Sequence, residues 1–255
     1  MGRLYTLFRW KMNNLVKSVL LLFGILLAGM AMKQSLMTVS SSMGFASGAQ
    51  IELFGPSKAS GVSTAILGML PLDDVWTLIS FLVLLLGALT FRYDRDSGVA
   101  KSVYSLPYSN DEFLWIKLLS FLIYGFLVVL LPFAYVTLTT YASIAGYLPE
   151  ITSNFMTDAQ IILTFLVLYL MAIATVVSLA SPNAFLAFMV GFALIYAPRV
   201  IGTSEIPPQL FIDAIARSGS ADFTPFTLHY FGWGLLVPAV LFAVSWVLIR
   251  RRDVV

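Results

Sequence analysis

The chain has 255 residues, of which 59% are hydrophobic, 14% aromatic and only 11% charged. A soluble domain has an apolar fraction of roughly 45–50%, so this composition excludes an ordinary water-soluble fold and indicates a lipid environment. The formal net charge is +2 and there is no cysteine. Disulfides, thiolate metal sites and a cysteine nucleophile are therefore excluded.

The chain starts with a basic segment before an apolar run, as a secretory signal peptide does. No small-residue cleavage site follows that run, so we expect an uncleaved first span. The apolar side chains of residues 3–14 share one helical face, namely Leu4, Leu7, Phe8 and Met12. This pattern predicts an amphipathic elbow helix at the membrane interface, leading into the first span.

Six apolar runs approach the roughly 20 residues that a helix needs to cross a bilayer. The fifth is the shortest, and we expect Pro198 to close it. Lys17 lies close enough to the end of the first run for its side chain to extend to the membrane surface. No ionisable residue lies at the centre of a run, which argues against an ion-driven secondary transporter. The predicted spans are Leu15–Met32, Val75–Phe91, Leu118–Thr139, Ile161–Leu179, Ala184–Ala197 and Phe231–Ile249.

The distribution of basic residues predicts the orientation of these spans. With both termini in the cytoplasm, eleven of the 15 Lys and Arg residues are on the cytoplasmic side, and the acidic residues lean to the outside. This is the positive-inside pattern, and an even number of spans agrees with it. We therefore expect an all-α membrane protein that crosses the plasma membrane six times, with residues 1–255 forming one membrane domain.

Two long segments are outside in this topology. Residues 33–73 are rich in Ser and Gly and show little helical periodicity, so we expect an outer loop there. In residues 199–229, Phe211, Ala214 and Ile215 fall on one helical face. This predicts a short outer helix between the fifth and sixth spans, either dipping into the outer leaflet or lying on the protein surface.

Residues 92–117 form a polar, charged island between two apolar runs, and the topology places them in the cytoplasm. Asp96 or Ser97 can cap the start of a helix. Val99, Val103 and Leu106 then form an apolar stripe at i, i+4 and i+7.

Two signals end that helix and begin the next. Pro107 disfavours helical backbone at the residue before it. Ser109 and Glu112 make an S-x-x-E capping box directly before the third apolar run. The sequence thus predicts a short helix across the membrane face, a proline corner and a long rising helix. The stripe can lie in the inner leaflet, or it can fit a groove in a cytoplasmic partner.

The island resembles the cytoplasmic loop of type 2 ABC-transporter permeases. In that family an acidic residue, a Ser or Thr with Gly, a run of aliphatic residues, Leu-Pro and a Ser-Arg-like pair precede the third span and its early Lys. Asp96 stands where Glu is commoner, and Asn110 stands where a basic residue is commoner. The matching residues are Asp96-Ser97-Gly98, Val99 to Leu106, Pro107-Tyr108-Ser109 and Lys117.

The resemblance implies the permease subunit of an ABC exporter, whose 97–106 helix couples to a nucleotide-binding ATPase. The chain has no G-x-x-x-x-G-K-[ST] sequence, so ATP and Mg²⁺ would be bound by a separate P-loop subunit. A second permease copy or a paralogue would complete the transporter, with membrane lipids around it. The residues that would form the ATPase-coupling interface are Asp96, Ser97, Gly98, Val99, Lys101, Val103, Tyr104, Leu106 and Pro107.

Three other functions fit parts of the sequence. An ATPase-coupled mechanical transmitter would keep the partner ATPase without transporting a substrate. A rhomboid-like intramembrane protease would use Ser47, in a Gly-Phe-Ala-Ser-Gly string, with His229 as its base. The methionines near the outer end of the first span could bind Cu(I) through their thioethers, but ordinary apolar packing also explains them. The basic C-terminal residues fit anionic lipid headgroups, so nucleic-acid binding is not needed to explain them.

Overall fold

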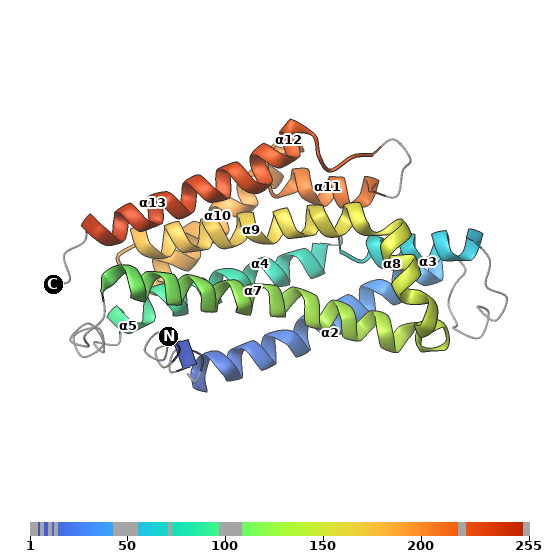
Figure 1. Cartoon of the computed structure of the whole chain (residues 1–255), viewed down its shortest axis with the longest axis horizontal. Helices are drawn as coiled ribbons and strands as arrows, with labels where there is room; N and C mark the ends of the chain where they lie inside the picture. Colours follow the sequence, from blue (N-terminus) through green and yellow to red (C-terminus); the bar gives the residue numbers. More distant parts are fainter. Residues whose placement is uncertain are drawn as a thin grey trace.

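The computed structural model describes residues 15–42, 56–70, 73–96, 109–218 and 223–251, together with positions 5, 8, 9 and 12. Every regular element in these residues is helical (Figure 1). Within the described residues, six helical stretches are long and apolar enough to cross a membrane, in agreement with the predicted number of spans. The elements are α2 (Leu15–Ser42), α3 (Pro56–Gly68), α4 (Asp73–Phe91), α5 (Tyr93–Asp96), α7 (Asn110–Thr140), η2 (Ala142–Tyr147), α8 (Leu148–Phe155), α9 (Thr157–Ala180), α10 (Ala184–Ile201), α11 (Gln209–Arg217), α12 (Leu228–Phe231), the π-helical turn η3 (Gly232–Leu236) and α13 (Val237–Arg251).

Three spans form the centre of the bundle and three lie at its periphery. In α9, 72% of the most apolar window is buried, whereas only 17% is buried in the span made by α12, η3 and α13. α4 and α7 are also mostly buried, while α2 and α10 are mostly exposed. The peripheral helices expose large apolar side chains such as Phe23, Phe185 and Leu236. Such surfaces suit contact with lipid rather than water.

The two ends of the bundle carry different elements (Figure 1). The start of α2, the short helix α5, the start of α7 and the end of α13 lie at one end, which we call the loop end. The short helices α3, α8 and α11 lie at the opposite end, which we call the cap end. The 92–117 island therefore joins the bundle at the same end at which the first span begins and the last one finishes.

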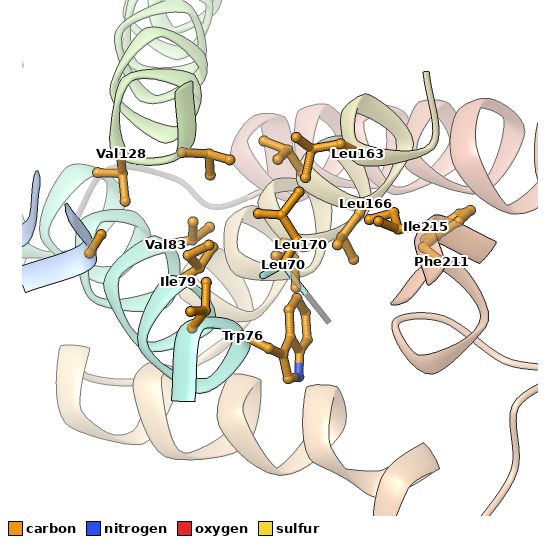
Figure 2. Packing of buried hydrophobic residues seen from close by; sticks show 14 of the residues in the cluster. Leu70, Trp76, Ile79, Val83, Val128, Leu163, Leu166, Leu170, Phe211 and Ile215 are labelled. Carbon is orange, nitrogen blue, oxygen red and sulfur yellow. The ribbon is translucent and has the colours of Figure 1, made fainter. Parts of the chain in front are cut away.

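The buried core runs from α4 through α9 to α11. Figure 2 shows Leu166 and Leu170 of α9 between Ile79 of α4 and Phe211 of α11. All four side chains are buried, and Phe211 also makes ring contacts with α9. The predicted short helix between the fifth and sixth spans is thus confirmed as α11, and its apolar face packs on protein.

The predicted outer loop 33–73 is wrong over much of its length. α2 continues ten residues beyond Met32 to Ser42, and α3 occupies residues 56–68. Buried Leu36 and Ser40 show why α2 continues, because this part of the helix packs against α3 and α7. Tertiary burial therefore stabilises a polar stretch whose sequence has weak helical periodicity.

The fifth span also differs from its predicted end. α10 continues through Pro198 to Ile201, because the proline lies in the last turn and the helix can lose one hydrogen bond there. The helix ends at Gly202, which has a positive φ of 76°. Its N–H donates to the carbonyls of Arg199 and Pro198. Such a left-handed residue is a common helix terminator, and glycine adopts it without a side-chain clash.

The sixth span contains a π-helical turn next to its proline. η3 ends at Leu236, and the N–H of Val237 donates to the carbonyl of Gly232, five residues earlier. Pro238 cannot donate and crowds the preceding turn, so a widened turn relieves that conflict. In the same turn Gly234 packs directly against the ring of Phe165 on α9, leaving no room for a Cβ atom.

Candidate functional site at the loop end

The predicted interface residues are only partly within the described structure. Asp96 ends α5, while Ser97, Gly98, Val99, Lys101, Val103, Tyr104, Leu106 and Pro107 lie outside the described residues. The described chain resumes at Ser109, directly before α7. The two attachment points of residues 97–108 are therefore visible, and the predicted 97–106 helix stays a prediction.

The first attachment point is held against the turn between α9 and α10. The Asp96 carboxylate accepts a hydrogen bond from the Ala184 N–H, with 2.7 Å between Oδ2 and N. Its Oδ1 lies 3.3 Å from the Arg92 Nε, an ion-pair contact without hydrogen-bond alignment. Arg92 Nη2 also donates to the carbonyl of Pro182. Asp96 and Arg92 thus bind the end of α4 and α5 to the start of α10.

Asp96 acts as a helix cap in a way that the sequence did not predict. Ala184 is the first residue of α10, and its N–H has no partner within that helix. The Asn183 side chain caps the same helix by accepting from the Leu186 N–H at 2.7 Å. A carboxylate at this position also interacts favourably with the positive end of the helix dipole. Asp96 therefore caps a helix 88 residues further along the chain.

The second attachment point confirms the predicted capping box. The Ser109 N–H donates to Glu112 Oε2 at 2.8 Å, and the Glu112 N–H donates to Ser109 Oγ at 3.2 Å. Asp111 Oδ1 accepts from the Trp246 indole Nε1–H at 3.0 Å. Because Trp246 is on α13, this bond joins the start of the third span to the end of the sixth.

Three basic side chains are buried near the loop end. Lys17, Arg92 and Lys117 have exposed fractions of 2%, 9% and 3%. Each of them has a polar or electrostatic partner within the protein, as buried charges require. Protein covers the Lys17 side chain, and its extension to the membrane surface stays a prediction.

The predicted elbow, residues 3–14, lies mostly outside the described residues. Phe8 and Met12 are half-buried and Arg9 is exposed, in line with the predicted faces. The Tyr124 hydroxyl of α7 donates to the Met12 carbonyl at 3.1 Å. This contact ties position 12 to the bundle, while the elbow as a whole stays a prediction.

The described part of the loop end consists of polar contacts that join distant elements. No group of three His, Asp or Glu side chains that could hold a metal ion occurs within the described ranges. Instead, one attachment point of residues 97–108 is fixed to α4 and α10, and the other to α7 and α13. A displacement of that segment would therefore be passed to four spans at once.

The residues behind the other functions are only partly described. Ser47 and Met43 lie outside the described residues, and His229 is exposed at the start of α12. Met30 is 67% exposed, whereas Met32 is fully buried in the core. These two thioethers thus have opposite environments, which favours ordinary packing over a shared copper site.

Comparisons with protein-family models, curated proteins and solved structures gave no match to this chain. The resemblance of residues 92–117 to ABC-transporter permeases accordingly stays a prediction from the sequence.

Sequence reasoning missed the partners of the two attachment points. Asn183 carries a local signal, because an Asn directly before an apolar helix is a typical N-cap. Arg92 with Pro182, Asp96 with Ala184 and Asp111 with Trp246 are separated by 88 to 135 residues. No local pattern in the sequence could have indicated these contacts.

Proposed function

We propose that the chain is the membrane permease subunit of an ATP-driven ABC exporter. It would work with a separate P-loop ATPase and with a second permease copy or paralogue in the plasma membrane, both termini being cytoplasmic. The observation that carries the proposal is the attachment of residues 97–108 to two different sets of spans. A segment attached in this way can convert a push from a cytoplasmic partner into movement of the bundle.

In the proposed mechanism, residues 97–106 contact the ATPase, with Val103 and Leu106 as buried anchors. ATP binding would bring the ATPase subunits together and move the two permease halves with them. Asp96 and Asp111 would transmit the movement, because each joins an attachment point to a distant helix. The six-span architecture and the absence of a P-loop motif in the sequence support a membrane permease that works with a separate ATPase.

The first test is to purify the tagged full chain gently from its native membrane and to identify co-eluting chains by mass spectrometry. We expect a P-loop ATPase in near-equal amount. The double variant Val103→Asp and Leu106→Asp should reduce its recovery at least about tenfold, because each buried Asp would be desolvated without a partner. Ile206→Asp with Phe226→Asp is the matched control, since both residues are exposed away from the loop end.

The same preparation separates transport from signalling. Reconstituted with its ATPase in vesicles, an exporter should move a substrate and show substrate-stimulated ATP hydrolysis. ATP hydrolysis without any transport would favour the mechanical transmitter. A complex that contains no ATPase, or full ATPase recovery with the Val103 and Leu106 double variant, would contradict the proposal.

A further inference from the structure

A pocket of about 840 Å³ lies at the cap end between α2 and the end of α7. Its size is within the range of pockets that bind small molecules, about 300–1,000 Å³. Lys33 and Gln34 of α2 and Thr139 of α7 line it, together with the thioethers of Met30 and Met37. The pocket thus combines a few polar groups with apolar walls, as ligand sites commonly do.

The pocket lies at the level of a membrane boundary. Lys17 is buried near the loop end, and Lys33 follows 16 residues later on the same helix, which corresponds to a rise of about 24 Å. The hydrocarbon core of a bilayer is about 30 Å thick. Lys33 is therefore close to the opposite boundary, where lipid headgroups meet acyl chains.

The hydrogen-bonding groups of the pocket favour an anion. The hydroxyls of Thr38 and Thr139 donate to carbonyls of their own helices, so they offer only lone pairs to a ligand. The remaining donors among the described lining residues are the ammonium of Lys33, the amide of Gln34, the hydroxyl of Thr140 and one hydroxyl of the Ser40–Tyr141 pair. No Asp or Glu occurs among the described lining residues, so Lys33 has no carboxylate partner within the pocket.

The walls of the pocket suit an alkyl chain. The lining residues Met30 and Met37 are 67% and 53% exposed. Outside the lining, Tyr135 and Leu138 on the adjoining stretch of α7 are exposed as well. The hydroxyl of Thr140, another lining residue, is buried and has no hydrogen-bond partner in the described structure. A buried polar atom of this kind is completed by a water or a ligand atom.

We propose that this pocket binds an amphiphile with an anionic headgroup, a carboxylate or a phosphate, whose alkyl chain runs along Met30 toward the bilayer centre. Lys33 provides the charge and Gln34 a second donor. The inference is independent of the coupling to an ATPase, because it concerns the opposite end of the bundle.

The test uses the full chain in nanodiscs of neutral phosphatidylcholine and three photoreactive probes with the same hexadecyl chain. Their headgroups are a carboxylate, an alcohol and a trimethylammonium. After illumination, labelled peptides are identified by mass spectrometry. We expect the carboxylate probe to label α2 and α7 near Met30 and Leu138, and the alcohol to label them about threefold to fivefold more weakly, as expected for the loss of one partly exposed ion pair.

Charge reversal makes the test specific. Lys33→Glu should weaken labelling by the carboxylate at least about threefold and should make the trimethylammonium the preferred probe. Arg199→Glu, which reverses an exposed charge near the end of α10, should leave the preference unchanged within about twofold. Equal labelling by all three probes, or a preference that follows Arg199 instead of Lys33, would overturn the proposal.

A final competition experiment distinguishes two natural occupants that share an anionic headgroup, a phospholipid and a free carboxylate amphiphile. Phosphatidylglycerol is added to the nanodiscs before the carboxylate probe. Suppression of labelling would identify an anionic phospholipid as the natural occupant, and persistent Lys33-dependent labelling would identify a free carboxylate amphiphile. Labelling that maps to the α7–α9 groove at Gln160 and Thr164 in place of α2 would again contradict the assignment.

Discussion

The two ends of this bundle are held together by different physical interactions. At the loop end, distant elements are joined by charged and polar contacts, such as Asp96 with the start of α10 and Asp111 with Trp246. At the cap end, the short helices α3, α8 and α11 pack mainly through buried apolar residues, with Phe211 fully buried.

This difference indicates which end mainly stabilises the bundle and which end mainly positions residues 97–108. Between helices in lipid, buried apolar side chains stabilise the bundle through close van der Waals packing, which is not directional. Polar contacts contribute less net stability, but they require a defined geometry. We therefore expect substitutions at the cap end to act mainly on stability and those at the loop end mainly on the placement of residues 97–108.

The largest expected effect is at the cap end. Phe211→Ala removes a fully buried ring that packs on Phe165 and Tyr169 of α9. Truncation of a buried Phe typically costs about 3–5 kcal/mol, and we expect a loss in that range for the free energy of unfolding. The measurement is unfolding by SDS in mixed micelles, with Phe226→Ala as the control, since Phe226 is 69% exposed. A cost under about 1 kcal/mol would show that apolar packing does not dominate this end.

At Asp96 we expect a smaller effect on stability and a separate effect on how the start of α10 is held. Asp96→Ala leaves the Ala184 N–H without its acceptor and Arg92 without its nearby carboxylate, and we expect a cost of about 1–2 kcal/mol. Asp96→Asn keeps an oxygen acceptor for Ala184 and should cost less. Hydrogen exchange at residues 184–187 reports this directly, because protection at the start of α10 should fall in the Ala variant and largely return in the Asn variant.

The same variants separate anchoring from partner contact. If Asp96 mainly positions the segment, as its internal contacts indicate, Asp96→Ala should retain far more of the co-eluting ATPase than Val103→Asp with Leu106→Asp. Equal loss in both would instead make Asp96 a direct contact of the partner.

The sequence predicted those features whose signals are local. Six spans follow from apolar runs, and the Ser109–Glu112 capping box follows from two residues three positions apart, so both are confirmed. The extension of α2 to Ser42 could not be predicted in this way, because packing against α3 and α7 stabilises it. The passage of α10 through Pro198 depends on which turn the proline occupies, and composition does not specify that.

The same distinction between local signals and tertiary contacts applies to the candidate site. Asp96 was selected from a motif, but its role as the cap of α10 arises from a contact across 88 residues. Lys17 was expected at the membrane surface because its long side chain can extend there, and only the packed bundle shows that protein covers it. Long-range polar contacts of this kind depend on the assembled fold and leave no periodic pattern.

The smallest expected effect concerns a polar contact at the cap end. Ser40 and Tyr141 share a buried hydrogen bond of 3.0 Å between their hydroxyl oxygens. Tyr141→Phe keeps the ring and should cost about 1 kcal/mol, the net contribution of a typical hydrogen bond.

The pH dependence of Tyr141→Phe tests the same contact in another way. Burial raises the pKa of Tyr141 above its ordinary value of 10.0, and the hydrogen bond with Ser40 lowers it only in part. Above about pH 10 the unfolded state therefore loses the Tyr141 proton more readily than the folded state, so wild-type stability falls as the pH rises. SDS unfolding measured on both sides of pH 10 should show a steeper alkaline loss in the wild type than in Tyr141→Phe. Parallel curves would mean that Tyr141 is not buried in the folded protein, and that its hydrogen bond with Ser40 does not hold α2 to the residues that follow α7.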